Sequence, residues 1–150
     1  MRNLKRWIAR RLGEEAGPVE DSDGLNLAAA ALLVEVLRAD HEVDAAERRQ
    51  VVASIGRYLG LAAADAAELL VLAERRVDES HDLYQFTSQV NRVCSDAEKL
   101  RLVEQLWRVA AADAVVHKYE EHMIRRISDL LHVPHRGFIA AKLRAEQPAG

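Results

Sequence analysis

SDAEKLRLVEQLWRVAAA, residues 95–112, decides the fold class of this chain. The segment opens with Ser-x-x-Glu, the capping-box pattern that starts a helix. Its apolar residues Leu102, Leu106 and Val109 then recur at steps of three or four, which places them on one helical face. The segment is therefore predicted to be an amphipathic helix.

The same helical period extends over the rest of the chain. Only three prolines and seven glycines interrupt the 150 residues, and 49% of the residues are hydrophobic. Gly60 stands where a C-cap glycine belongs, and Pro134 stops the helix before it. We therefore predict an all-α fold, a single globular bundle of about seven helices. The predicted helices span residues 25–39, 45–59, 63–77, 83–93, 95–112, 118–131 and 135–145.

Residues 1–24 differ from the rest and are predicted to lie outside the bundle, whose domain is expected over residues 25–146. Residues 2–12 are predicted to form a short amphipathic helix with five basic residues beside one apolar face. An acidic linker containing glycine and proline follows it. Two interpretations of the helix stay open. It makes weak contact with an anionic membrane surface, or it docks on the domain or on a partner. The apolar face consists of Leu4, Trp7, Ile8 and Leu12.

Charge and cysteine content narrow the function classes. The formal net charge of −3 argues against a nucleic-acid partner. The single cysteine, Cys94, permits neither an intrachain disulfide nor a cysteine-based metal site. The sequence has no secretory signal pattern and no apolar run near the roughly 20 residues of a membrane span. A cytoplasmic location is therefore expected, with the inner face of the membrane as the alternative for residues 2–12.

A weak internal repeat divides the predicted bundle into two similar halves. Residues 36–40, VLRAD, resemble residues 109–113, VAAAD, and the match continues after a one-residue slip in the following helix. Each copy is predicted to be a helix hairpin with one open apolar face, so that two packed hairpins close a core. The matched residues after the slip are Val51, Val52, Ile55, Tyr58, Leu59 and Leu61 against Met123, Ile124, Ile127, Leu130, Leu131 and Val133.

The repeat also places an Asp and a Glu at the bend of each hairpin. Asp40 and Asp113 each lie four residues after a valine of the apolar stripe, and Glu47 and Glu120 each lie four before an apolar residue of the next helix. All four carboxylates therefore extend apolar stripes, and each pair is expected to converge where its hairpin bends. Inward-facing carboxylates need a compensating partner such as a cation. With the matching loop residues, the candidate metal ligands are Asp40, Asp44, Glu47, Asp113, His117 and Glu120.

At these residues the chain resembles the tellurite-resistance TerB-like family, in a branch of small bacterial proteins. The resemblance extends over roughly residues 25–144 and implies a helical fold of two similar halves, with an acidic cluster as its proposed metal site. It also implies a place in bacterial stress-response and membrane-associated assemblies rather than in catalysis. His41 and Ala114 stand where family members usually have glycine. The segments that carry the resemblance are residues 38–47, RADHEVDAAE; 82–87, DLYQFT; 112–121, ADAVVHKYEE; and 131–135, LHVPH.

The acidic corners support two interpretations. In the first they bind a divalent cation whose identity stays open, since oxygen ligands favour Ca²⁺ or Mg²⁺ whereas His117 favours a transition metal. In the second, Asp44 and Glu47 form a capping box, Asp40 accepts hydrogen bonds from the loop, and no metal is needed.

The remaining histidines and the cysteine are weaker candidates. His132 and His135 flank a proline at a helix end, where surface and capping roles are common, and His122 is assigned to the same group. Cys94 has acidic neighbours, which raise the pKa of its thiol and argue against a nucleophile.

These patterns lead to a prediction of function. We expect a non-enzymatic TerB-like domain that acts as a metal-binding or protein-interaction module in bacterial stress response, with other proteins as partners. The alternatives are a purely structural adaptor, a peripheral membrane-surface protein, and a metalloenzyme with a substrate-sized pocket beside Asp40 or Asp113. The sequence contains no glycine-rich phosphate loop, catalytic-triad order or zinc-protease motif, which disfavours the enzyme.

Overall fold

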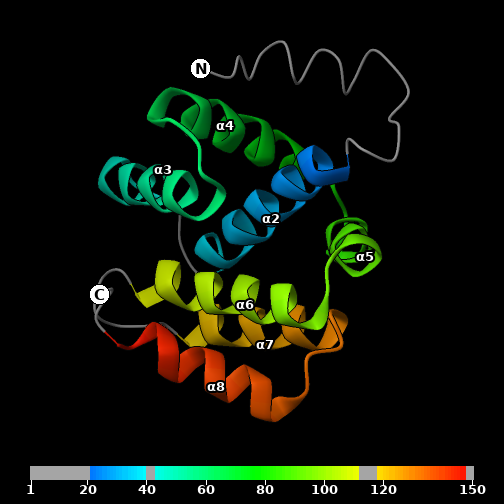
Figure 1. Ribbon diagram of the computed structural model, residues 1–150. Coiled ribbons are helices and arrows are strands. Elements are labelled where there is room, and N and C mark those ends of the chain that lie inside the picture. Colours follow the sequence, from blue (N-terminus) through cyan, green and yellow to red (C-terminus); the bar gives the residue numbers. More distant parts are fainter. Residues whose placement is uncertain (1–20, 40–42, 112–117, 148–150) are drawn as a thin grey trace.

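The computed structural model of the chain describes residues 21–39, 43–111 and 118–147. Within them lie seven helices and no strand, which confirms the predicted all-α class (Figure 1). The expected amphipathic helix at residues 2–12 lies outside the described residues. The helices are α2 (Asp21–Leu37), α3 (Ala45–Leu59), α4 (Ala63–Glu79), α5 (Tyr84–Val93), α6 (Asp96–Ala110), α7 (Lys118–Leu130) and α8 (His135–Ala145).

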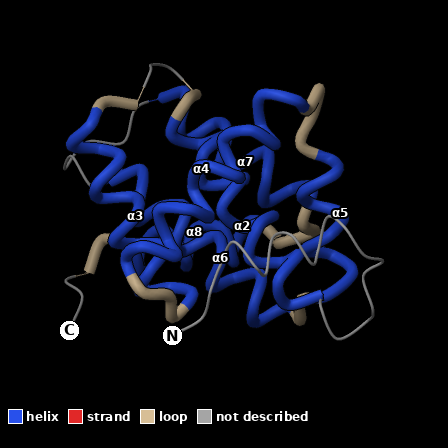
Figure 2. Tube along the Cα trace, turned by 90° about the horizontal axis from the view of Figure 1, so that it is seen from above, coloured by secondary structure: helices blue, strands red, loops and turns tan. Residues whose placement is uncertain are grey.

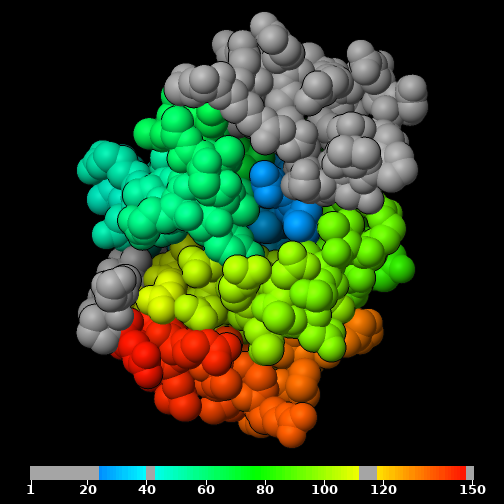
Figure 3. Space-filling view, viewed as in Figure 1, coloured from blue at the N-terminus to red at the C-terminus, as the bar shows by residue number. Residues whose placement is uncertain are grey.

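Helix α2 is the centre of the bundle. It packs against α4, α5, α6 and α7, and it lies among them in two perpendicular views (Figures 1 and 2). Every residue from Ala28 to Val34 is buried, so α2 is covered on all sides rather than on the single stripe that the sequence suggested. Only a small part of it is visible on the face drawn in Figure 3. The helix also begins at Asp21, inside the segment expected to be a linker.

The two copies of the repeat support each other. Helix α3 packs against α6, the first helix of the other copy, and α7 packs against α2. The two first helices, α2 and α6, also contact each other. Helix α4 covers α2 and α3, while α8 covers α6. The open face of each copy is therefore closed by the other copy together with additional helices, α4 and α5 for the first copy and α8 for the second.

The repeat is also visible in how its second helices end. Gly60 after α3 and His132 after α7 both adopt the left-handed conformation, with φ of 70° and 62°. In each case the next residue donates a backbone hydrogen bond across the last turn, from Leu61 N to Gly56 O and from Val133 N to Ser128 O, both 2.9 Å. This is the bonding that closes a helix C-terminus, so the C-cap predicted at Gly60 is confirmed.

None of the helices in the described segments combines the length and the apolar character that a bilayer span requires.

Candidate functional site

The ends of four helices meet at one corner of the bundle, around a small cavity of about 10 Å³. Leu37 at the end of α2, and Val109 and Ala110 at the end of α6, form its apolar wall. Glu47 on α3 and Glu120 on α7 line the same cavity. A volume of this size accommodates about one water molecule or one ion. We call this the corner cavity.

Among the described acids at the corner, Glu120 is the most deeply buried. It lies in the first turn of α7, and only 3% of its surface is exposed. An anion is favoured there because the backbone N–H groups of a helix N-terminus carry a partial positive charge. Ile124, one turn further along α7, is fully buried. Glu120 thus continues the apolar stripe of α7, as the sequence predicted.

The equivalent residue of the first copy has a different role. Glu47 is half-buried and completes a capping box with Asp44 at the start of α3. The backbone N–H of Glu47 donates to Asp44 Oδ1 at 2.8 Å, and the backbone N–H of Asp44 donates to Glu47 Oε1 at 3.1 Å. The capping arrangement predicted as the metal-free interpretation of these two residues is therefore confirmed. Asp44 is exposed and is not part of the cavity lining.

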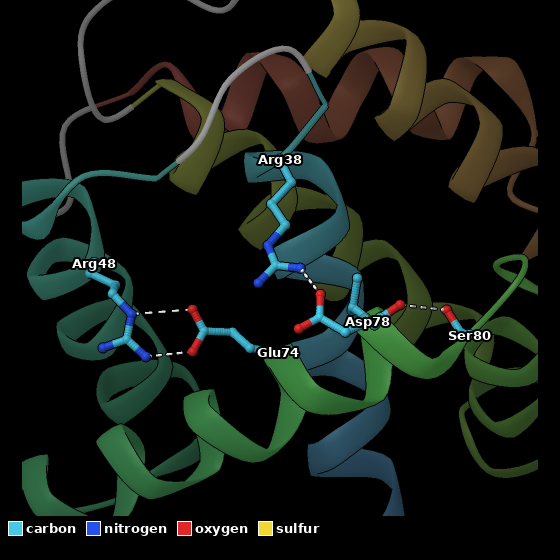
Figure 4. A network of polar contacts seen from close by, with 6 residues as sticks. Arg38, Arg48, Glu74, Asp78 and Ser80 are labelled. Atoms are coloured by element: carbon cyan, nitrogen blue, oxygen red, sulfur yellow. Dashed lines mark hydrogen bonds and ion pairs between the residues drawn. The ribbon is translucent and has the colours of Figure 1, made fainter.

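Two arginines of the first copy of the repeat form ion pairs with α4 (Figure 4). Arg48, which follows Glu47, makes a forked pair with Glu74 of α4, with its Nε 3.1 Å from Oε2 and its Nη2 bonded to Oε1. The bond raises the pKa of Arg48 further above its ordinary value. Arg38, just beyond α2, pairs with Asp78 of α4 at 2.6 Å. Helix α4 is therefore ion-paired both to the residue that follows α2 and to the first turn of α3.

The predicted ligand set is only partly covered by the described residues. Asp40, Asp113 and His117 lie outside them. Of the three ligands inside, Glu47 and Glu120 line one cavity and Asp44 lies apart as the cap. In the segments that the structure describes, no group of three or more His, Cys, Asp or Glu side chains is placed to hold a metal ion.

Two polar residues of the cavity were missed by the sequence analysis. Gln50 and Ser54 on α3 line it beside Glu47. They lie three and seven residues after Glu47, a spacing that puts all three on one helical face. This spacing could have identified them, but the repeat drew attention to charged residues alone.

The remaining histidines and the cysteine lie away from the corner cavity. His122, His132 and His135 are all exposed. Burial, followed by the nearby charge of Glu98, raises the pKa of the Cys94 thiol, which is the direction that the sequence predicted. Burial also raises the pKa of Tyr58 to about 12.

Comparison with known proteins gives one finding. The model of a family described as Tellurite resistance protein TerB matches residues 26–143, which is most of the chain. Comparison with curated proteins and with solved structures gives no significant match. The match spans α3 to α7 completely and includes both acidic corners of the repeat.

Proposed function

The chain belongs to the TerB family, and from that premise we propose that it is a non-enzymatic module that binds a divalent cation at the corner cavity. In this proposal the cation links the two copies of the repeat and tunes a surface for other proteins of a bacterial stress-response assembly. The observation that carries the proposal is that Glu47 and Glu120, equivalent residues of the two copies, line one cavity.

The chemistry of the cavity favours a hard cation. Carboxylate and amide oxygens are the ligands that Ca²⁺ and Mg²⁺ prefer, and the lining supplies both through Glu47, Glu120 and Gln50. The volume of about 10 Å³ suits an ion and is far below that of a substrate.

Charge supports the same proposal. A divalent cation between Glu47 and Glu120 would neutralise both carboxylates at once. Asp40 and Asp113, which follow the ends of α2 and α6 in the sequence, are further ligands in this proposal.

A melting series tests the proposal. Ca²⁺, Mg²⁺, Mn²⁺ or Zn²⁺ is added to the metal-stripped full chain, and the melting temperature is followed as a function of concentration. A bound ion raises it, because binding to the folded state alone stabilises by RT ln(1 + [L]/Kd). Glu120→Gln, and separately Asp40→Asn with Asp113→Asn, should abolish the rise.

Asp65→Asn is the matched control for these variants. Asp65 is a buried acid of α4, 4% exposed, that does not line the corner cavity. Its variant should keep the cation-dependent rise even if its basal melting temperature falls. Absence of any rise with all four ions, together with no metal in elemental analysis of the native protein, would overturn the cation proposal.

A second candidate function, a purely structural adaptor, is favoured by the capping box of Asp44 and Glu47. In an adaptor these acids serve the start of α3 and nothing else. Asp44→Ala would then lower stability by about 1 kcal/mol to the same extent with and without divalent ions. A melting series with this variant separates the two functions.

A further inference from the structure

A second pocket, of about 220 Å³, lies at the opposite end of α6 from the corner cavity. The start of α6, the turn after α7 and the start of α8 come together there (Figure 1). Helix α6 has 15 residues, so the two sites are separated by roughly 20 Å at 1.5 Å per residue. We call it the α6–α8 pocket.

The unusual residue of this pocket is Lys99. Its surface is only 8% exposed, and it lines the pocket. Across the described segments, no hydrogen bond or ion pair of its ammonium is found; Arg48 and Arg108, by contrast, both pair with carboxylates. A lysine can bury its stem and keep its charged end in a polar space. Lys99 Nζ is not among the buried atoms that lack a partner, so the ammonium reaches the open space of the pocket, where an anion from outside the chain can pair with it.

The other polar groups of the pocket also favour an anionic ligand. Arg136 and His132 line it together with a single acid, Asp96. A lysine, an arginine and a histidine thus line the pocket with one carboxylate. The pocket therefore carries a net positive charge.

The first turn of α8 adds backbone donors. Pro134 occupies the N-cap position and provides no side-chain cap. The N–H groups of Gly137 and Phe138 bond back to Pro134 O at 2.8 and 3.0 Å. The N–H groups of His135 and Arg136 come earlier in the turn, where a helix offers no internal acceptor. A helix start of this kind favours a bound anion.

The rest of the lining is apolar and tightly packed. Leu100 and Val133 form its walls beside Gly137. A Cβ added at Gly137 would lie 2.8 Å from Leu100 Cδ2 and 3.2 Å from Val133 Cγ1, so α6 and α8 approach each other closely there. The pocket therefore combines a charged end with a closely packed apolar wall. An inorganic ion would contact only the charged end, whereas an organic anion would contact both.

We propose that the α6–α8 pocket binds a small organic anion, whose carboxylate or phosphate lies between Lys99 and Arg136 and whose hydrocarbon part packs against Leu100 and Val133. Lysine and arginine bind both kinds of oxyanion. The proposal is independent of the cation site, because the two sites share no lining residue.

The first copy of the repeat offers an internal comparison. In the register of the repeat, Asn26, Gly60 and Ala64 occupy the positions of Lys99, His132 and Arg136. The cationic groups are therefore a property of the second copy alone and are not required by the shared fold. They are what a binding function added to one copy would need.

Nuclear magnetic resonance titrations of the full chain test the proposal with benzoate and phenyl phosphate as probes, and with benzyl alcohol as the neutral control. The signals followed are the backbone amides of His135 and Arg136 and the Cε of Lys99. We expect saturable shifts with at least one anion and none with the alcohol. Lys99→Met, which keeps the unbranched stem, should weaken binding about tenfold or more, because the main counter-charge is lost.

Two further variants make the result decisive. Lys118→Met removes an exposed lysine of α7 outside the pocket and should bind like the parent chain. Arg136→Gln changes an exposed residue, so it should fold even if Lys99→Met does not, and it should also weaken binding. Shifts with benzoate alone identify a carboxylate ligand, and shifts with phenyl phosphate alone identify a phosphate. No saturable shift with either anion, or unchanged binding in both pocket variants, would overturn the proposal.

Discussion

The two copies of the repeat end alike and begin differently. After α3 and after α7 the chain makes the same left-handed turn, with a glycine in one copy and a histidine in the other. At the start of α3, Glu47 closes a capping box close to the surface, whereas at the start of α7 its equivalent Glu120 is buried. The backbone of the turn is shared although the residue differs, and the histidine adopts its positive φ at a steric cost. The repeat thus preserves geometry, while burial decides what each side chain does.

Burial also differs along the two helices. Leu59 of α3 and its equivalent after α7, Leu131, occupy the same repeat position, but Leu131 is fully buried and Leu59 only partly. The end of the second helix is therefore buried more deeply in the second copy than in the first. Four predictions test this comparison, and their expected effects decrease in the order given.

The largest effect is expected at these two leucines. Leu131→Ala should lower the free energy of unfolding by about 3 kcal/mol, because it leaves a cavity in a fully packed core. Leu59→Ala should cost roughly half as much, since its site is already partly open and can relax. Urea denaturation of both variants measures the difference. Equal losses at the two positions would contradict the unequal burial of these two helix ends.

The next effect concerns the ion pairs that connect the helices of each copy to the helix that covers it. In the second half, Glu104 of α6 accepts from Arg108 at 3.1 and 2.9 Å and from Arg144 of α8 at 3.0 Å. Burial acts to raise the pKa of Glu104, but the bonds from the two arginines outweigh it and hold this pKa below its ordinary value of 4.5. Glu104→Gln should therefore cost about 1.5 kcal/mol at neutral pH.

The pH dependence of that loss follows from the sign of the shift. Because the folded-state pKa is the lower one, the stabilisation by Glu104 is fully present above 4.5 and is lost as the pH falls through the folded-state value. Parent and variant should thus become equally stable in acid. Glu74→Gln, which breaks the corresponding pair with the more exposed Arg48, should cost less at neutral pH. Unfolding curves over a pH series check both points, and a loss that persists in acid would show that packing is the cause.

A smaller effect is expected at the capping box of the first copy. Asp44→Ala should lower stability by about 1 kcal/mol, because the N–H of Glu47 loses its acceptor. Ser95→Ala removes the same kind of bond, to the N–H of Glu98, at the start of α6 and serves as the control. Similar losses by thermal denaturation are expected for both. A much larger loss at Asp44 would mean that this residue does more than cap.

The local features of this fold could be predicted from the sequence because they depend on neighbouring residues. The capping residues Asp44 and Ser95 and the terminating Gly60 each act within one helical turn. The complete burial of α2 could not be predicted, since it results from four helices that come together from distant parts of the chain.

In the candidate sites, too, the features set by neighbouring residues could be predicted and those set by distant residues could not. The sequence predicted that Glu120 continues an apolar stripe, and it is buried. The prediction that each Glu lies beside the Asp of its own copy concerns residues outside the described segments. The sequence did not predict that the corner cavity brings together Glu47 and Glu120 from different copies. Lys99 drew no attention because its burial depends on α8, which packs over α6 from 36 or more residues further along the chain. Contacts of this range leave no local pattern in the sequence.

The smallest effect is expected where the two copies share a turn but not a residue. His132 has a positive φ of 62°, a conformation that glycine adopts without steric cost and that most other residues avoid. His132→Gly relieves this strain but gives the unfolded chain more freedom, so we expect a net gain of about 0.5 kcal/mol. Calorimetry of this variant beside Gly60→Ala, which should lose stability at the equivalent turn, measures both. If His132→Gly also weakens the binding of organic anions, the histidine is retained for the α6–α8 pocket at the expense of the turn; a loss of stability would instead mean that its side chain supports the fold.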